Sequence, residues 1–400
     1  MIRKPEISAP SSAELAALKW HSIECELVTP MYGGGVESTV VDEKMPIRVS
    51  SIRGQLRFWW RLLAEHKWKL GSAKAIREAE FDLWGGMGDA NGSKSSKVFI
   101  RVEQPQHTAL VDYDDKEINL PYVLFPAANE TDESKNPHRL LKAEDSVFVM
   151  QIAFSNLALH QPVLIEQVIE ALRWWGSFGG LGFRSRRGLG AVRLIACSEF
   201  EQVTQSVSAE EAALANCRLI MRGNAGPNAM QQLRNAIQRL ADFRQGKNIG
   251  RNPGQQHNRP GRSRWPEPDA LRRIQRTHHT DHAPVHAAGN VFPRALFGAP
   301  IIYHFVGRGE PRDVELKFAT GERLPSPIII RPYLAENTAE PRWFSAVLVL
   351  PYQHLLNQQV TVGSRELYPV WQADVVQHIQ PVRDNNGTDP IQAFANFFAG

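Results

Sequence analysis

Glycine and arginine are concentrated in one short stretch of this chain, residues 179–190. Five glycines and three arginines occupy these twelve positions. Glycine lets the backbone reach positive φ and lets a ligand approach the main chain closely, while arginine offers a permanent charge, a planar fork for phosphate and a flat face for bases. The stretch, here called the glycine–arginine loop, therefore indicates contact with a phosphodiester backbone. The residues expected to make it are Gly180, Gly182, Arg184, Arg186, Arg187, Gly188 and Gly190.

The position of this loop argues against a nucleotide cofactor. Gly180-x-Gly182 resembles a dinucleotide fingerprint, but that motif lies between a strand and a helix and is followed by an acidic residue about 20 positions on. Here the glycines follow an apolar, helix-like run ending at Trp175 and precede a strand. A P-loop is also excluded, because no Gly-Lys-Ser/Thr follows the glycines. We therefore expect a polymer as the ligand and no cofactor.

A second group of arginines lies in a helix expected from Ile52 to about Trp68. Arg53, Arg57 and Arg61 are spaced by four residues, which places them on one helix face. The face could simply be solvated, but the helix N-terminus adds free N–H groups that attract anions, and we favour phosphate binding. The residues assigned to it are Arg48, Ser50, Arg53, Arg57 and Arg61, whereas Trp59 and Trp60 are expected in the core.

Other residues with chemical potential form no convincing site. The histidine-rich stretch 278–286 could bind zinc, but its spacing matches no closed site, so we interpret it as a polar loop and expect no metal. Asp82 and Asp89 flank a glycine turn, and either catalysis or turn chemistry explains them equally well. The isolated histidines are His21, His66 and His160. We predict a binding protein with no catalytic residues.

The expected elements of the first half alternate as β-α-β-β-α-β. This order is the ferredoxin-like arrangement, which RRM-type RNA-binding domains share. It predicts an α+β fold with a ferredoxin-like domain over residues 1–200, although a fold alone does not establish function. The expected strands are 20–28, 97–103, 146–156 and 191–196, and the expected helices are 52–68 and 162–175.

The second half predicts a degenerate ferredoxin-like domain over residues 207–400. Residues 207–241 have a helix-rich pattern. The segment 243–266 has arginines but no acidic residue, which predicts a long loop or a disordered arm, within an Arg-rich loop spanning 243–286. Further elements are expected as helices 268–276 and 391–398 and as strands 301–306, 327–331 and 344–350.

Composition is that of an ordinary globular protein. The chain has 400 residues, of which 42% are hydrophobic and 22% charged, with a net charge of +4, so two domains are expected. Cys25, Cys197 and Cys217 have neither disulfide-scaffold nor zinc-knuckle spacing. The first residues lack an apolar signal core, and no run approaches the roughly 18 apolar residues that span a bilayer. We expect a cytoplasmic protein with no membrane contact.

Four ordered blocks in the first 200 residues also carry a family resemblance. They are 29–35 (TPMYGGG), 47–61 (IRVSSIRGQLRFWWR), Trp84-Gly85 followed by Lys97-Val98, and the glycine–arginine loop. They resemble the RAMP superfamily of CRISPR-associated RNA-binding proteins, and most closely the first-numbered Cmr subunits of type III-B effector complexes. Residues 292–298 and 324–327 are similar with lower specificity. One departure is Trp84-Gly85, where relatives more often carry Phe-Gly.

The resemblance implies tandem ferredoxin-like domains that contact RNA through the glycine-rich loop and a basic cleft. It also implies assembly with other Cmr or RAMP subunits and with crRNA, and capture of target RNA near the crRNA 3′ end in antiviral defence. The resembled subfamily is non-catalytic. The alternative is a metal-independent, crRNA-processing endoribonuclease of the same superfamily, with His21 or His66 as general acid or base. A third is a scaffold subunit whose arginine-rich segment docks on protein neighbours.

Overall fold

The computed structural model describes residues 18–35, 40–87, 92–129, 139–143, 146–254, 261–321, 323–335, 338, 340–363 and 366–400. The chain divides into two compact units, each discontinuous in sequence. Unit 1 comprises Met1–Asn216, Ala225–Met230 and Arg331–Phe344. Unit 2 comprises Cys217–Asn224, Gln231–Ile330 and Ser345–Gly400. The domain boundaries expected from the sequence, 1–200 and 207–400, stay a prediction.

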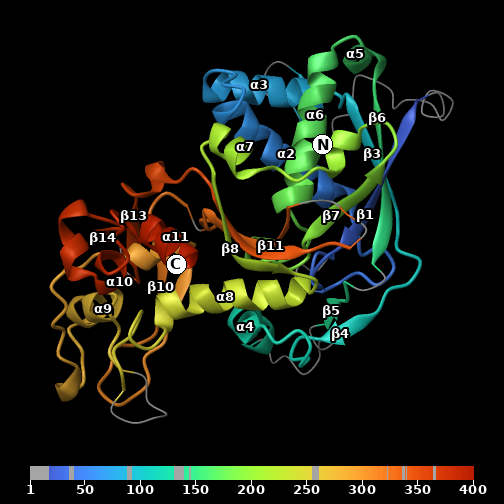
Figure 1. The fold of residues 1–400 in the computed structure, drawn as a ribbon. Coiled ribbons are helices and arrows are strands. Elements are labelled where there is room, and N and C mark those ends of the chain that lie inside the picture. Colours follow the sequence, from blue (N-terminus) through green and yellow to red (C-terminus); the bar gives the residue numbers. More distant parts are fainter. Residues whose placement is uncertain are drawn as a thin grey trace, which may run out of the picture. The chain divides into compact units, whose positions relative to one another are not determined.

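The main sheet of unit 1 confirms the ferredoxin-like arrangement. Its strands lie in the spatial order β3-β6-β1-β7, and the pairings of β1 with β6, β1 with β7 and β3 with β6 are antiparallel. Helix α2 follows β1 in the chain and α6 follows β6, which reproduces the expected β-α-β-β-α-β order (Figure 1). The bounds are β1 Trp20–Leu27, α2 Val49–His66, β3 Val98–Glu103, β6 Val147–Phe154, α6 Pro162–Phe178 and β7 Val192–Cys197.

Burial along β1 and between the helices explains this arrangement. Ile23, Cys25 and Leu27 alternate with more exposed residues, so one face of β1 is buried. The helices pack together through aromatic rings, with the Trp59 centroid 5.8 Å from that of Trp174. The prediction that Trp59 and Trp60 belong to the core is confirmed, because each is only 1% exposed. These contacts fix the end of α6, from which the glycine–arginine loop departs.

Unit 1 also contains a helix that the sequence analysis missed. Residues Ala73–Trp84 form α3, in a segment to which the sequence analysis assigned no element, and the Ser72 hydroxyl caps it by accepting from the Ala75 N–H at 3.3 Å. A second, three-stranded sheet has the order β2-β5-β4. The remaining elements are β2 Met31–Tyr32, β4 Leu110–Asp112, α4 Pro121–Asn129, β5 Arg139–Leu141, α5 Asn156–Leu159, η1 Ser185–Arg187, η2 Glu201–Thr204 and α7 Ala209–Leu214.

The second half of the chain has the order β8-α8-β11-β12-α11 with the strands arranged β11-β12-β8. This is the ferredoxin-like order, but the described part of the sheet has three strands instead of four. It agrees with the prediction of a degenerate second domain. Each of the three strands begins in one unit and ends in the other. The prediction that residues 207–241 are rich in helix is wrong for residues 218–226, which form the strand β8. The bounds are β8 Arg218–Gly226, α8 Ala229–Gln245, β11 Ile328–Leu334, β12 Trp343–Val349 and α11 Pro390–Ala399.

A long insertion between α8 and β11 contains the basic segment. Helix α8 continues to Gln245, so the expected loop or disordered arm begins later than predicted. Bridges join Lys247 to Arg251 and Arg251 to Ser263, and Arg259 lies outside the described residues. A four-stranded sheet, β14-β13-β10-β9, accompanies them. The bounds are α9 Glu267–Gln275, η3 Thr280–His282, η4 Pro293–Phe297, β9 Ile301–Tyr303, β10 Val314–Phe318, η5 Gln353–Leu355, β13 Gln359–Val362, β14 Leu367–Pro369, η6 Ala373–His378 and α10 Gln380–Arg383.

Among the described residues, no helix combines the length and apolar character that crossing a membrane requires.

Candidate nucleic-acid interface

The backbone of the glycine–arginine loop is fastened to the segment that follows β1. The Thr29 hydroxyl donates to the Gly188 carbonyl at 2.6 Å and accepts from the Ala191 N–H at 2.9 Å. The Gly190 N–H donates to the Pro30 carbonyl at 2.8 Å. Thr29 is fully buried, so these hydrogen bonds are shielded from water. The sequence blocks 29–35 and 179–190 are therefore hydrogen-bonded to each other and form one structural unit.

Close backbone packing accounts for the glycines of the loop. At Gly182, which has φ +74°, an added Cβ would lie 2.5 Å from the Tyr32 carbonyl oxygen. At Gly190, which has φ +61°, it would lie 2.1 Å from the Leu181 carbonyl oxygen. Gly180 pairs with Ala191 in an isolated bridge. We predicted these glycines because they allow a ligand to approach closely. The structure shows that the fold also requires glycine at these positions, because a side chain would collide with neighbouring backbone.

The three loop arginines occupy a single helical turn with a fixed backbone. Arg184 has φ +60° and Gly188 has φ +83°, and between them η1 forms one 3₁₀ turn. The Arg184 guanidinium lies 5.6 Å from the ring centroid of Phe125, a side chain that is 55% exposed. The Arg186 guanidinium lies 5.1 Å from the ring centroid of Phe58. The turn therefore presents cations next to aromatic rings, a combination suited to phosphates and bases.

All three loop arginines are partly exposed. Burial lowers the pKa of Arg186 to about 10, so this guanidinium still carries its charge at neutral pH. Arg187 donates from Nη1 to the Arg186 carbonyl at 3.4 Å.

A buried arginine that the sequence analysis missed holds the ends of the loop together. Arg331 of β11 is 3% exposed and donates to the carbonyl oxygens of Gly179 at 2.8 Å and Val192 at 3.0 Å. Its Nε donates to the Pro332 carbonyl at 3.0 Å. Burial lowers the pKa of Arg331 to about 9, and these carbonyl dipoles compensate part of the desolvation. In the sequence, the only sign of a buried role for Arg331 was its position in the apolar run 327–331, which was expected to be a strand.

Arg53 faces protein acceptors instead of solvent. Its Nη1 donates to the Trp84 carbonyl at 3.2 Å and to the Ser96 hydroxyl at 2.9 Å, and its Nη2 donates to the Val98 carbonyl at 3.1 Å. Burial and the neighbouring Arg57 charge lower the pKa of Arg53. The guanidinium thereby joins the end of α3 to β3, which connects two of the sequence blocks of the family resemblance.

Arg57 and Arg61 share one carboxylate. Glu80 of α3 accepts at Oε1 from Arg57 Nε at 2.7 Å and from Arg61 Nη1 at 2.6 Å. The Glu80 side chain is 7% exposed, whereas those of Arg57 and Arg61 are 26% and 46% exposed. The three helix arginines do lie on one face, as predicted, but that face is directed toward α3. Phosphate binding by Arg57 and Arg61 would have to compete with Glu80.

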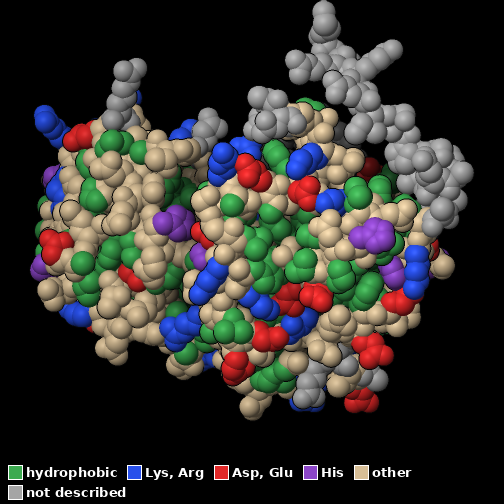
Figure 2. All heavy atoms as spheres, turned by 90° about the horizontal axis from the view of Figure 1, so that it is seen from above, with side chains coloured by type: hydrophobic (Ala, Val, Ile, Leu, Met, Phe, Trp, Pro, Cys, Tyr) green, Lys and Arg blue, Asp and Glu red, His purple; other side chains and the backbone are tan. Residues whose placement is uncertain are grey.

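The remaining predicted contacts lie at the start of α2. Arg48 is the residue preceding the helix and donates from Nη1 to the Gly35 carbonyl at 2.8 Å, while Ser50 is exposed in the first turn. On the face drawn in Figure 2, Lys and Arg side chains are interspersed with Asp and Glu, and no stripe of one charge crosses it. Pairing of arginine with carboxylate is therefore a recurring feature of this molecule.

The described candidate acid–base residues have other partners than the loop in the contacts known for them. His21 is buried and its Nδ1 is 2.6 Å from Glu199 Oε2, with the rings of Phe154 and Phe200 beside it. His66 Nδ1 lies 3.4 Å from Asn216 Nδ2, and His160 is exposed. Asp82 forms ion pairs with Lys94 and Lys97, and Asp89 lies outside the described residues.

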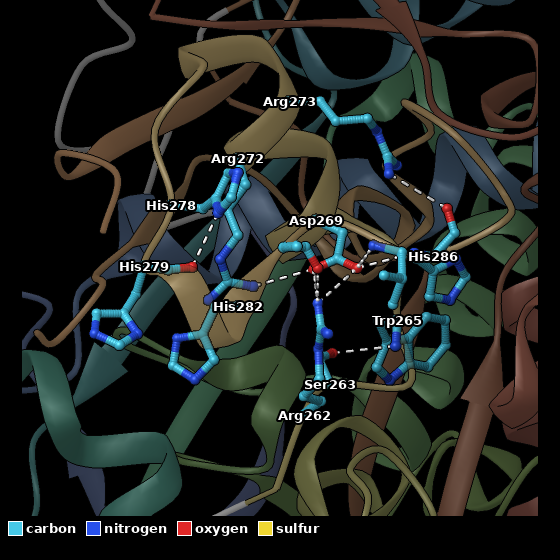
Figure 3. A network of polar contacts seen from close by, with 12 residues as sticks. Arg262, Ser263, Trp265, Asp269, Arg272, Arg273, His278, His279, His282 and His286 are labelled. Atoms are coloured by element: carbon cyan, nitrogen blue, oxygen red, sulfur yellow. Dashed lines mark hydrogen bonds and ion pairs between the residues drawn. The ribbon is translucent and has the colours of Figure 1, made fainter. Parts of the chain in front are cut away.

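The histidine-rich stretch belongs to a network of side-chain contacts in unit 2 (Figure 3). His282 pairs with Glu310, and Arg272 Nε donates to the other oxygen of Glu310 at 2.9 Å. His286 donates from its backbone N–H to Asp269 at 2.9 Å. Within the described residues no group of three or more His, Cys, Asp or Glu side chains is arranged to hold a metal ion.

Comparison with known proteins identifies one family and several structural neighbours. Among solved structures, Cmr1 from Pyrococcus furiosus in its apo form is similar at 19% identity, covering 60% of this chain and 80% of that one, with a TM-score of 0.41. A chain of the type III-B Cmr-beta complex with cognate target RNA, AMPPnP and ssDNA is similar at 11% identity, covering 94% and 98%, with a TM-score of 0.40. No curated protein matches the chain. Residues 24–193 match the model of the RAMP superfamily.

Proposed function

We propose that this protein is a non-catalytic RNA-binding subunit of a type III-B (Cmr) CRISPR effector ribonucleoprotein in the cytoplasm. It binds crRNA together with other Cmr or RAMP subunits and helps capture target RNA near the crRNA 3′ end. The observation that carries the proposal is the glycine–arginine loop, which holds three arginines on a backbone fixed at both ends inside a RAMP domain. The motif blocks that resemble first-numbered Cmr subunits support the choice of complex.

The physical argument is one of preorganisation. A loop whose backbone is already hydrogen-bonded has little conformational entropy left to lose when RNA binds. Arg184, Arg186 and Arg187 can hold phosphates through charge-assisted hydrogen bonds, and the rings of Phe58 and Phe125 lie beside two of them. Arg48 and Ser50 extend this surface, whereas Arg53, Arg57 and Arg61 contribute only so far as RNA competes with their protein acceptors.

The salt dependence of RNA binding tests the loop directly. Each phosphate neutralised by a protein cation adds about 0.7 to the slope of log K against log salt for a single strand. The Arg184/Arg186/Arg187→Ala variant should therefore lose about two units of slope relative to the unmodified protein. Affinity is measured by fluorescence anisotropy on a labelled single-stranded RNA over a range of salt concentrations.

A control variant removes three exposed cations elsewhere in unit 1. Lys19, Lys74 and Arg77 are all exposed, and the Lys19/Lys74/Arg77→Ala variant changes the net charge equally. It should retain nearly the full slope. Equal slopes for the loop variant and the unmodified protein would refute phosphate contact by the loop.

Two further measurements address partners and catalysis. Sequencing the RNA that co-purifies with the tagged protein from its host should recover crRNA, and other Cmr or RAMP subunits should co-purify. Incubation with labelled repeat RNA should produce no discrete cleavage. Cleavage that disappears in His21→Ala or His66→Ala variants would instead establish the endoribonuclease alternative.

A further inference from the structure

A basic pocket lies in unit 2, formed by the insertion and the segment around α10. It has a volume of about 350 Å³, within the range typical of small-molecule sites. Every residue that lines it belongs to unit 2. The lining residues that matter here are Asn252, Arg262, Arg264, His286, His378 and Arg383. The only carboxylate in the lining is that of Asp269.

Asp269 is fully engaged by its own surroundings. Its oxygens accept from Arg262 Nη2 at 3.0 and 3.2 Å, from Arg272 Nη1 at 3.1 Å, and from the backbone N–H groups of Val285 and His286 at 2.9 Å each. Figure 3 shows these contacts converging on the one side chain. Burial opposes ionisation, but the two backbone N–H groups and Arg262 outweigh it and hold the pKa of Asp269 below its ordinary value. This carboxylate therefore organises the pocket wall and already has cationic partners.

Arg264 contributes a positive charge that no carboxylate balances in the described part of the chain. Its Nε donates to Asn252 Oδ1 at 2.8 Å and its Nη1 donates to the Asn248 carbonyl. Both acceptors are neutral, so they fix the orientation of the guanidinium without compensating its charge. Arg383 adds a second guanidinium, which is 51% exposed and pairs with Asp384 at 2.8 Å. Arginine forks held in this way match the geometry of phosphate oxygens.

His286 lines the pocket with an uncharged imidazole ring. Its Nδ1 accepts from the Ala288 N–H at 3.2 Å, which leaves the proton on Nε2, where it faces the Arg264 carbonyl at 3.2 Å. Burial lowers the pKa of His286, in agreement with a neutral ring. The net charge of the lining thus comes from its arginines. The pocket is also larger than a phosphate ion alone requires, and its amide side chains can hydrogen-bond a sugar or a base.

We propose that this pocket binds a phosphate group carried by a nucleotide. The ligand could be a free nucleoside monophosphate or the phosphorylated end of an RNA strand, which present the same chemistry. The site is separate in sequence and in residues from the glycine–arginine loop, so the inference does not rest on the proposed RNA contact of that loop. It adds a second phosphate-binding site, in unit 2.

Calorimetric titration of the full chain with adenosine 5′-monophosphate tests the proposal. The nucleotide should bind saturably, and adenosine should bind at least about tenfold more weakly because it lacks the phosphate. The Arg264→Gln variant should weaken nucleotide binding by about tenfold or more. Because Arg264 also orders the turn at Asn248 and Asn252, the exposed Arg383→Gln variant serves as a second probe, with an expected loss of severalfold.

Two controls separate this site from other cationic surfaces. Arg308 is exposed in unit 2 and does not line the pocket, so Arg308→Gln should bind the nucleotide like the unmodified protein. The Arg184/Arg186/Arg187→Ala variant should do the same, whatever it does to RNA binding. The proposal is overturned if the nucleotide does not bind, if both pocket variants bind it normally, or if only the loop variant loses it.

The source of the phosphate is then decided with RNA. A single-stranded oligonucleotide with a 5′-phosphate is compared with its 5′-hydroxyl counterpart on the unmodified protein and on Arg264→Gln. A preference for the phosphorylated strand that disappears in the variant identifies an RNA end as the ligand. Equal binding of the two strands, together with saturable binding of the monophosphate, identifies the free nucleotide.

Discussion

Two regions of unit 1 carry three arginines each, and they use them differently. On α2, Arg53, Arg57 and Arg61 donate to acceptors supplied by α3, by Ser96 and by β3. In the glycine–arginine loop, hydrogen bonds of the backbone and of the Thr29 hydroxyl join the loop to the segment after β1. The arginines of the helix are therefore part of what holds α3 in place, whereas the loop backbone has hydrogen bonds of its own to the segment after β1.

This difference shows that arginine spacing alone does not identify a phosphate site. On the helix face a buried carboxylate of the protein lies within reach of two of the guanidinium groups. Glu80 supplies that acceptor on the helix face, and it is buried enough for its loss to be costly. Substitutions that disturb one of these two arginine regions and leave the other intact test the difference between them.

The largest effect is expected from removing Arg331, which ties the two ends of the loop. Arg331→Ala would leave the buried carbonyl groups of Gly179 and Val192 without their donor, and each such group costs about 1–3 kcal/mol. We expect the free energy of unfolding to fall by about 3 kcal/mol or more. Urea denaturation gives this value, with the exposed Arg77→Ala as the control.

Hydrogen exchange of the loop amides completes that experiment. The backbone N–H groups of Phe183 and Gly190, both hydrogen-bonded to the segment after β1, should exchange faster in Arg331→Ala. The helix-to-α3 contacts should be unaffected. Unchanged protection in the loop would show that its backbone does not depend on Arg331, and the contrast between the two regions would weaken.

An intermediate effect is expected at Glu80. The Glu80→Gln change removes the charge that Arg57 and Arg61 share, and it should lower the free energy of unfolding by about 1–2 kcal/mol. It also releases two partly exposed guanidinium groups. The salt slope of RNA binding should then steepen by up to about one unit if the helix face adjoins the bound RNA. A loss of stability with an unchanged slope would assign these arginines to structure alone.

The smallest effect concerns Asp82, another carboxylate of α3, which pairs with Lys94 and Lys97. The hydrogen bond from Lys97 holds the pKa of Asp82 below its ordinary value, with burial acting in the opposite direction. Its contribution to stability is therefore complete above the ordinary pKa of about 3.9 and is lost as the pH falls below it. Because the side chain is 44% exposed, the contribution should stay below about 1 kcal/mol.

Comparing Asp82→Asn with the unmodified protein at two pH values checks this. The variant should be slightly less stable at pH 7, and the difference should shrink as the pH falls below about 3.9. A difference that persists at the lower pH would mean that the carboxylate charge is not what stabilises this end of α3.

The sequence was sufficient for the main sheet of unit 1 and its helices α2 and α6 because the information for these elements is local. Alternation along β1 and the helical spacing of Leu56, Trp59 and Leu63 each depend on neighbouring residues, and the order of such elements then limits the topology. The strand β8 was misread because its apolar run Leu219–Met221 is short, and short apolar runs fit a helix or a strand equally well.

The site was harder to predict because its partners lie far apart in sequence. Glu80 is separated from Arg57 by 23 positions and lies on α3, a helix that the sequence analysis did not predict. Arg331 is separated from Gly179 by 152 positions, and nothing in either stretch signals the pairing. The basic segment likewise lacks acidic residues of its own, but Asn252, and Asp269 on α9, provide acceptors that order part of it.

Arg331 also sets an order of events during synthesis of the chain. The ribosome releases the glycine–arginine loop well before it reaches the residue that joins Gly179 to Val192. Until then the nascent sheet can pair its four strands, but the loop lacks its clamp. A fragment that stops near residue 200 would contain the residues that match the RAMP superfamily model but would lack the arginine that joins the two ends of the loop. Maturation of this surface therefore waits for the C-terminal part of the polypeptide.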